Sequence, residues 1–350
     1  PKELYVNNKY YQQEVYFSMA NLLRITPWWD ASLATDVQWN EMNSNMAMFA
    51  RPVRFTEMVA VATTMRGYGL DAQASLLGTF VQDEAGDGEV HERTMQYRNE
   101  WTPAVFVSWK PLADAEWDVN AFVKRAFRMP TFNDLYYAEV GSKNLKPEYT
   151  MQYSLSSGYR CGFTDAFMQS VKLQGDVYYN EVTNKIVAYP SGQQFRWTML
   201  NLGKVKIFGV EASAEGSARV GMVDLGLRLN YTYQIARDYT DKADSYYGHQ
   251  IPYIPLHAGS VVGRAHYRGW NLNYSFIYTG ERYNAQENIP ANYEQPWYTH
   301  DASLIKDFNI GRVGCRVGLE VNNIFDQDYE VILNYPMPGR NYKVTLKVNI

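Results

Sequence analysis

The sequence contains no run of about eighteen apolar residues, which is the length that a membrane-spanning helix needs. It has only two cysteines, Cys161 and Cys315, so it offers no disulfide framework, and we expect both thiols to be unpaired. The net charge is −4 and no basic cluster is present, whereas a nucleic-acid partner needs a basic face to displace counterions from phosphates. The sequence therefore excludes a helical membrane protein and disfavours nucleic acid as a partner.

Signals for enzyme chemistry are also lacking. The five histidines are scattered, without the HExxH or GxSxG spacings. His300 lies next to Asp301, but neighbours on a strand point to opposite faces, so this pair does not suit catalysis. The acidic segment Asp83, Glu84, Asp87 and Glu89 lacks the ligand spacing of a calcium loop and is read as a solvated external loop. We predict no enzymatic activity, no metal site and no cofactor.

What the sequence has is alternation of apolar and polar residues. Aromatic residues make up 15% of the chain, with 29 Tyr and 9 Trp, while the mean hydropathy is only −0.41. Between residues 223 and 235 every odd position is apolar, and the even positions hold Asp, Gly, Arg, Asn, Thr and Gln. Segments 270–279 and 341–350 repeat this pattern. Strands with one greasy and one polar face are typical of a transmembrane β-barrel, although a β-sandwich alternates too.

About fifteen strands are predicted from this pattern, with boundaries uncertain by a few residues. They cover residues 14–24, 30–42, 56–66, 70–81, 101–109, 118–127, 149–159, 170–181, 201–213, 223–237, 256–267, 270–279, 298–307, 313–323 and 341–350.

The connections between these segments alternate in length. Short turns are expected near Pro27, Gly67, Pro111, Gly221, Gly269 and Gly311. Long loops are expected at 43–54, 82–98, 129–146, 238–255 and 282–297. Short turns on the periplasmic side and long loops outside are typical of bacterial outer-membrane barrels. We therefore predict an all-β fold, an antiparallel transmembrane β-barrel in the bacterial outer membrane.

The odd strand number leads to a further expectation. In an antiparallel barrel the first and last strands must themselves pair antiparallel, so single-chain bacterial barrels have even strand numbers. We expect residues 1–350 to be the C-terminal portion of a larger barrel, with the first strands missing.

Four segments together resemble the TonB-dependent outer-membrane receptors. The first segment, FRMPTFNDLYY followed by NLKPE, contains Phe127, Arg128, Pro130, Leu135, Tyr136, Leu145, Pro147 and Glu148. The second, NLGKVKIFGVE, contains Asn201, Gly203, Gly209 and Glu211. The third and fourth, VNNIFDQDYE and YPMPGR, precede the last strand, and YPMPGR contains Gly339 and Arg340. We interpret these residues as structural. The prolines punctuate a loop, Asn322, Asn323, Asp326 and Asp328 form turns, and Gly339 provides a backbone position that allows positive φ.

The resemblance implies a barrel of about twenty-two strands that encloses a plug domain, and an N-terminal segment that engages the TonB complex. The plug and roughly seven strands are absent from this chain on that reading. The implied function is active uptake of a scarce bulky nutrient, a ferric siderophore or a cobalamin-like ligand. A haem receptor would be expected to carry a histidine between the FR-P and NL-PE motifs, and residues 131–143 contain none.

Aromatic and cationic residues in three predicted loops are the candidate ligand-binding residues, because aromatic faces near a guanidinium suit an anionic or planar ligand. They are Phe195, Arg196 and Trp197; Tyr246, Tyr247 and Tyr253; and Arg282, Tyr283 and Trp297. Polar-face residues such as Arg228, Asn230, Lys343 and Lys347 are expected to contact the plug or to hydrate the transport path. Membrane lipid or lipopolysaccharide and a surface lipoprotein are further candidate partners.

Two alternatives remain at this stage. A passive porin or diffusion channel shares the strand pattern but needs no plug. A soluble β-sandwich adhesin or glycan-binding module shares the alternation, with its apolar side chains buried between two stacked sheets.

Overall fold

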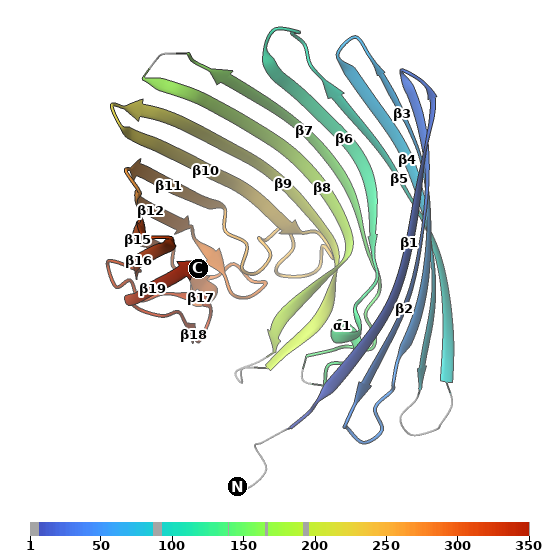
Figure 1. Cartoon of the computed structure of the whole chain (residues 1–350). Coiled ribbons are helices and arrows are strands. Elements are labelled where there is room, and N and C mark those ends of the chain that lie inside the picture. Colours follow the sequence, from blue (N-terminus) through green and yellow to red (C-terminus); the bar gives the residue numbers. More distant parts are fainter. Residues whose placement is uncertain (1–6, 87–92, 139, 165–166, 192–195, 350) are drawn as a thin grey trace, which may run out of the picture. The chain divides into compact units, whose positions relative to one another are not determined.

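A computed structural model describes residues 7–86, 93–138, 140–164, 167–191 and 196–349 of the chain. Fifteen antiparallel strands of this part form one sheet in the order β1-β2-β3-β4-β5-β6-β7-β8-β9-β10-β11-β12-β15-β16-β19, almost entirely in sequence order (Figure 1). The prediction of an all-β fold with a long antiparallel sheet is confirmed. No helix in the described ranges is both long and apolar enough to cross a membrane.

The main strands in the first half are β1 (Tyr10–Thr26), β2 (Trp29–Ser44), β3 (Val53–Gly67), β4 (Leu70–Gly86), β5 (Arg93–Trp109), β6 (Glu116–Arg128) and β7 (Glu148–Gly162). Those in the second half are β8 (Met168–Ser191), β9 (Arg196–Val220), β10 (Val223–Asp238), β11 (His257–Tyr267), β12 (Trp270–Thr279), β15 (Trp297–Ile310), β16 (Val313–Asn322) and β19 (Asn341–Asn349).

The long connections contain small elements of their own. They are the helix α1 (Phe132–Tyr136), the 3-10 turn η1 (Pro290–Asn292), the ribbon of β13 (Arg282–Tyr283) with β14 (Tyr293–Glu294), and the ribbon of β17 (Glu330–Ile332) with β18 (Tyr335–Pro336).

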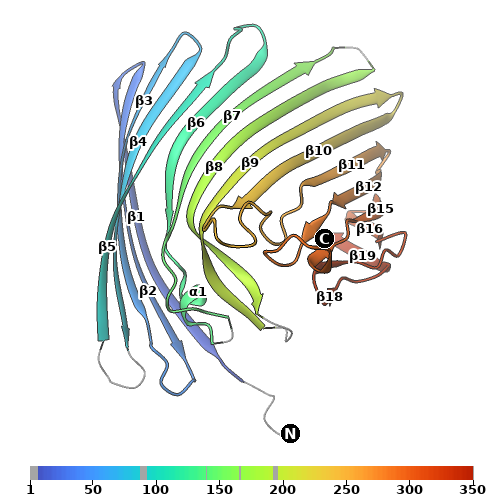
Figure 2. The same ribbon diagram turned by 180° about the vertical axis from the view of Figure 1, so that it is seen from behind.

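The chain divides into two compact units. Unit 1 comprises residues 1–109, 121–153 and 182–202, and unit 2 comprises residues 110–120, 154–181 and 203–350. In unit 1, β1 to β5 follow one another as an antiparallel meander (Figure 1). In unit 2, β10, β11, β12, β15, β16 and β19 do the same (Figure 2).

Short turns and long loops alternate along the sheet, as predicted. In the turns Tyr68-Gly69 and Arg268-Gly269 both residues have positive φ. This is the signature of the two-residue hairpin turn whose twist matches that of the flanking strands, and the glycine adopts positive φ without steric cost. The short turns set the register of each hairpin, so the long connections all leave from the other ends of the strands.

The faces of the sheet are sorted as the alternation predicts. On β10, the side chains of Leu227, Leu229 and Tyr231 are 49%, 40% and 47% exposed. Their cross-strand partners on β11 are Gly263, Val261 and Gly259, which continue the same face because directly opposed residues share a side of the sheet. We call this the apolar face and the side that carries Arg228 the polar face.

Ion pairs cross the polar face in unit 2. Arg316 Nε lies 2.5 Å from Asp307 Oδ1, and Lys343 Nζ lies 3.3 Å from Glu320 Oε2. Charged groups thus compensate one another on one side of the sheet while the other side offers hydrocarbon.

Buried apolar side chains gather at the ends of the strands from which the long loops leave, where loops cover them. Val205, Ala236 and Ile251 are such residues in unit 2, and Met42 and Phe132 in unit 1. The described residues form one large sheet and two small ribbons, without a second sheet stacked against the apolar face. The β-sandwich alternative is therefore wrong.

Several boundaries differ from those expected. Strand β4 runs to Gly86 and β5 begins at Arg93, so residues 82–86 and 93–98 of the expected loop are paired strand. Strands β8 and β9 extend to Ser191 and from Arg196, so the expected loop between residues 181 and 201 is largely a long hairpin. Trp297 begins strand β15 and does not lie within the preceding loop. For β8 and β9, the alternation of apolar and polar residues weakens around the sequence AYPSGQQF. Pairing between the two strands, which the local sequence does not show, extends them beyond the predicted ends.

Charge on the apolar face tests this sorting. We expect Leu229→Arg in the intact protein to destabilise it by about 2–4 kcal/mol, because a cation near the middle of the lipid face loses its hydration. Urea unfolding in phospholipid vesicles measures the effect. The matched control is Thr232→Arg, which places the cation on the polar face opposite Glu211. Equal destabilisation by both variants would contradict the assignment of the faces.

Candidate functional site

Three long loops of unit 2 are joined into one structure, which we call the loop cluster: residues 239–256, 280–296 and 323–340. The Tyr253 amide donates to the Tyr283 carbonyl at 2.8 Å, joining the first two loops. Asn288 extends this link, since its Oδ1 accepts from the Gln250 amide at 2.7 Å and its Nδ2 donates to the Gln250 carbonyl at 3.0 Å. The predicted residues Tyr253 and Tyr283 are therefore adjacent, although thirty positions separate them in the sequence.

Arg282 ties the second loop to the third. Its side chain is only 3% exposed, and its guanidinium donates to the carbonyls of Gln295 at 3.1 Å and Glu330 at 2.6 Å. Burial lowers the pKa of Arg282 from its ordinary value, with the carboxylate of Glu294 acting in the opposite direction. Buried behind these carbonyls, Arg282 holds the loops together, and its part in ligand binding stays a prediction.

Tyrosine rings line the loop cluster in pairs. The ring centres of Tyr247 and Tyr239 lie 5.2 Å apart in an edge-to-face arrangement. Those of Tyr283 and Tyr293 lie 6.0 Å apart in the same arrangement. The ring centres of Trp297 and Tyr329 lie 4.6 Å apart. The indole nitrogen of Trp297 is buried and has no hydrogen-bond acceptor among the described residues. These contacts position flat, half-buried ring surfaces on loops that are fixed to one another.

Two tyrosine hydroxyls of the loop cluster lie beside carboxylates. Burial raises the pKa of Tyr246 from its ordinary value, and the hydrogen bond and charge of Asp244 act in the same direction. Burial likewise raises the pKa of Tyr293, assisted by Glu281. The Tyr293 hydroxyl donates to Glu281 Oε2 at 3.3 Å, so these carboxylates fix the orientation of the two rings.

The remaining three predicted ligand residues belong to unit 1. Phe195 lies outside the described residues. Arg196 and Trp197 are the first residues of β9 rather than part of a loop. A cation beside a loop tyrosine was not predicted from the sequence. The ammonium of Lys206 on β9 lies 5.5 Å from the centre of the Tyr239 ring.

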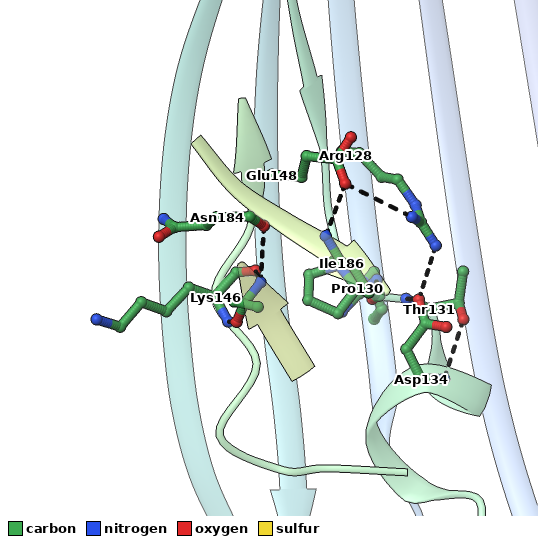
Figure 3. Close-up of polar contacts among 10 residues, drawn as sticks. Arg128, Pro130, Thr131, Asp134, Lys146, Glu148, Asn184 and Ile186 are labelled. Atoms are coloured by element: carbon green, nitrogen blue, oxygen red, sulfur yellow. Dashed lines mark hydrogen bonds and ion pairs between the residues drawn. The ribbon is translucent and has the colours of Figure 1, made fainter. Parts of the chain in front are cut away.

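Four residues of the family motifs in unit 1, together with Asn184 of β8, form a second structure that we call the loop brace. The motif residues are Arg128, Asp134, Glu148 and Asn201. Glu148 Oε2 accepts from the Ile186 amide at 2.8 Å and lies 3.9 Å from Arg128 Nη1 (Figure 3). Arg128 also reaches Asp134 at 3.0 Å, and Asp134 closes a capping box with Thr131 at the start of α1 (Figure 3). The FR-P and NL-PE motifs thus hold the 129–147 loop against β8.

Asn201 is the central residue of the loop brace. Its Oδ1 accepts from the Lys146 amide at 2.7 Å, while its Nδ2 donates to the carbonyls of Lys146 at 3.0 Å and Asn184 at 2.7 Å. An asparagine side chain that donates and accepts in this way replaces a missing piece of strand pairing. This explains the asparagine of the NLGKVKIFGVE motif.

The loop that contains α1 is also clipped to β3. Arg54 makes two hydrogen bonds to the carboxylate of Asp83, at 2.5 and 2.9 Å, and donates to the Pro130 carbonyl at 2.8 Å. Its guanidinium lies 5.2 Å from the centre of the Phe132 ring. Asp83, read from the sequence as part of a solvated loop, is instead paired here; Asp87 and Glu89 of that segment lie outside the described residues.

The glycines of the motifs are explained by close approach. A Cβ at Gly209 would lie 2.2 Å from the Tyr178 ring, and one at Gly203 would lie 2.5 Å from Thr240 Cγ2. Gly339 was expected to have positive φ, and this is wrong, since it is absent from the residues with positive φ. A Cβ there would lie 2.9 Å from Asp326 Oδ1, which accepts from the Arg340 amide at 2.7 Å.

Positive φ is found instead in the preceding turn, at Asn323 and Asp326, which confirms their turn-forming role. The same role for Asn322 is wrong, since Asn322 ends strand β16 and pairs with Asn341; for Asp328 it stays a prediction. Asn323 Oδ1 accepts from the Gln327 amide and its Nδ2 donates to the Gln327 carbonyl, both at 2.8 Å. The described residues contain no group of three or more His, Cys, Asp or Glu side chains that could hold a metal ion. Cys161 and Cys315 are free.

A single antiparallel sheet with an exposed apolar face, an ion-paired polar face and alternating short turns and long loops defines a transmembrane β-barrel. The family model described as "TonB dependent receptor-like, beta-barrel" matches residues 9–324. The chain therefore belongs to the TonB-dependent receptor family and to the outer membrane of a Gram-negative bacterium.

Curated relatives include the vitamin B12 transporter BtuB of Photobacterium profundum, which is 28% identical over 66% of this chain and 35% of that protein. The ferrichrome outer membrane transporter/phage receptor of Escherichia coli (strain K12) is 29% identical over 45% of this chain and 21% of that protein. The chain thus spans about a third or less of the length of these relatives.

Among solved structures, the copper transporter OprC matches 97% of this chain and 57% of its own, with a TM-score of 0.72 and 15% identity. The ferric citrate transporter FecA in the unliganded form matches 96% and 54%, with a TM-score of 0.70 and 15% identity. At this identity they show the fold alone. The relatives are transporters and receptors rather than enzymes, and they do not support the porin alternative.

The loop brace generates a testable expectation. Asn201→Ala leaves the backbone groups of Lys146 and Asn184 without their partners, and we expect a local cost of about 1–2 kcal/mol. Trypsin cleavage after Lys143 in the intact protein should accelerate about five- to thirtyfold, because cleavage follows the population of the opened loop. Asn133→Ala, an exposed asparagine of the same loop, is the control. An unchanged rate for Asn201→Ala would show that Asn201 does not hold the loop.

Proposed function

We propose that this chain is the C-terminal barrel portion of a TonB-dependent receptor that takes up a scarce bulky nutrient, either a ferric siderophore or a cobalamin-like ligand. The observation that carries the proposal is the family match over residues 9–324. The relatives named for vitamin B12 and ferrichrome support the ligand class.

The architecture of the sheet supports the view that the chain is part of a larger barrel. Among the described residues, β1 pairs with β2 alone and β19 pairs with β16 alone. Unpaired strand edges are not stable in hydrocarbon, where backbone groups find no water. We propose that further strands satisfy both edges and that a plug domain occupies the interior, where the ion-paired polar face and the side chains of Arg228 and Asn230 contact it.

The loop cluster is proposed to capture the ligand. Tyr246, Tyr247, Tyr253 and Tyr283 lie on loops that hydrogen bonds and Arg282 fix to one another. Half-exposed aromatic rings on a rigid support bind large flat or apolar ligand surfaces with little loss of conformational entropy. Trp297 has a buried N–H without an acceptor among the described residues, which makes it a candidate donor to ligand. Arg196 and Trp197, at the start of β9 in unit 1, are proposed as separate ligand-contacting residues.

The proposed partners follow from this role. The TonB complex would act through an N-terminal region outside this chain and remodel the plug with energy from the inner membrane. Lipopolysaccharide would surround the outer rim of the barrel, and a surface lipoprotein would contact the external loops.

Uptake by the intact receptor tests the proposal. The receptor gene is expressed in a strain without its own cobalamin and ferrichrome receptors, and accumulation of labelled cyanocobalamin and ferrichrome is measured. We expect accumulation of one of them, and its complete loss when TonB is deleted. Equal accumulation with and without TonB, together with entry of small unrelated solutes, would contradict active uptake and indicate a passive channel.

The role of the loop tyrosines is tested separately. Tyr247→Ala and Tyr283→Ala should each weaken binding of the transported ligand about three- to tenfold, because each removes one aromatic contact of about 0.5–1.5 kcal/mol. Binding is measured by fluorescence titration of the purified intact receptor. Tyr68→Ala, at a fully exposed short turn on the other end of the strands, should have no effect. Unchanged binding in both loop variants would remove the loop cluster as the capture site.

A further inference from the structure

The apolar face of unit 2 is hollowed between β8 and β12. One hollow has a volume of about 550 Å³ and is lined by Gly216, Ala218, Leu225, Gly263, Ala265 and Leu272 among others. A second hollow of about 670 Å³ lies beside it and shares Ala214 and Leu229 with the first. Together they form a groove on the side of the sheet that faces hydrocarbon, which we call the apolar groove.

The register of the strands explains the groove. Rows of directly opposed residues cross this face, and small and large side chains alternate along each row. One row runs Ala218, Leu225, Ala265, Leu272, and the next runs Gly216, Leu227, Gly263, Tyr274. No atom lies within 4 Å of the position that a Cβ of Gly263 would occupy. The leucines of β10 and the large residues of β12 thus stand as ridges beside two channels whose floors are β9 and β11.

At the short-turn end of the groove, two cations lie on the same face. Lys306 lies directly opposite Trp270. It is two positions beyond the exposed Leu304 on β15, so the alternation predicts an apolar residue at this position. Its ammonium lies 4.9 Å from the centre of the Trp270 ring and donates to the Arg268 carbonyl at 2.8 Å. Arg268 is exposed in the turn, 5.4 Å from the centre of the Tyr267 ring.

Neither cation is neutralised. In the part of the chain that the structure describes, no carboxylate lies within ion-pair distance of Lys306 or Arg268. The nearest acidic neighbour in sequence, Asp307, is on the polar face and pairs with Arg316. Arg268 instead donates to the sulfur of Met222, a residue that is itself 64% exposed. Two positive charges in a belt of exposed Tyr, Trp and Met side chains therefore lack an anionic partner.

The cations and the groove are continuous. Ala265 and Leu272 line the groove, and the next residues toward the turn on the same face are Tyr267 and Trp270, which pair with each other. Two residues of strand correspond to about 7 Å, so an anion held at Lys306 and Arg268 lies one short step from the end of the groove. The short-turn end of an outer-membrane barrel faces the periplasm, where the leaflet consists of phospholipids.

We infer that this face carries a specific phospholipid site: Lys306 and Arg268 bind the phosphate of an anionic glycerophospholipid from the periplasmic leaflet, and an acyl chain fills the apolar groove. The match of charge at one end and hydrocarbon at the other favours a phospholipid over a second copy of the chain, which would leave both cations unpaired. The inference depends on the location in the outer membrane and is independent of the nutrient transported.

Native mass spectrometry of the intact receptor in a mild detergent, titrated with dioleoylphosphatidylglycerol, tests the site. Near an anionic headgroup each cation is worth roughly a fivefold change in affinity. We therefore expect Lys306→Gln and Arg268→Gln each to weaken the tightest binding step about fivefold, and the double variant about thirtyfold. Lys347→Gln, which removes a cation from the polar face of β19, is the matched control and should bind as the unmodified receptor does.

A second variant tests the groove without touching the charges. Gly263→Leu fills open space and should weaken binding of the same lipid while leaving folding intact, as judged by electrophoretic mobility without heating. Dioleoylglycerol, which has the acyl chains and no phosphate, should bind weakly to every form.

Three results would overturn the inference: undiminished phosphatidylglycerol binding by the double variant, equal binding of dioleoylglycerol, or a receptor dimer that Gly263→Leu dissociates. The last result would show that a second copy covers this face. Loss of nutrient uptake in the absence of any change in lipid binding would bear on the proposed function alone.

Discussion

The exposure of one uncharged face of a continuous sheet is the constraint on which the rest of the structure depends. Leu227, Leu229 and Tyr231 lie on the open side of β10, and water would make that arrangement unstable by the full cost of hydrating large apolar surfaces. Hydrocarbon removes the cost, and it also requires that every backbone group be paired within the sheet. Strand pairing in sequence order, short turns on one side and loops on the other follow from that requirement.

The sequence alone predicted a long antiparallel sheet and its two faces, because both follow from a period of two that each strand carries locally. It also predicted most long connections. What it missed depends on contacts between distant residues. Strand β8 continues to Ser191 and β9 begins at Arg196, although alternation is weak in the sequence around these positions. The clip between Arg54 and the Pro130 carbonyl joins positions 76 residues apart.

The candidate site shows the same division. Tyr246, Tyr247 and Tyr253 were predicted to lie in a long connection, and they lie between β10 and β11, whereas Tyr283 lies in the short strand β13 of the next long connection. The hydrogen bonds of Asn288 and Arg282 that hold these loops together could not be predicted from the local sequence. An arginine in a loop is expected to be exposed unless the carbonyl groups that it contacts are known. Gly339 was assigned to backbone geometry, whereas crowding by Asp326 requires the glycine. Glycine patterns indicate that a position is special without indicating the reason.

The most direct test of the central claim measures what each face meets. Single cysteines are placed at position 229 or 230 of the intact receptor, after Cys161 and Cys315 have been replaced by serine, and are labelled with an environment-sensitive fluorophore in vesicles. The account predicts quenching by lipids brominated on the acyl chain at position 229 and not at 230, with the opposite response to aqueous iodide at 230. A label at 229 that brominated lipids do not reach would contradict it.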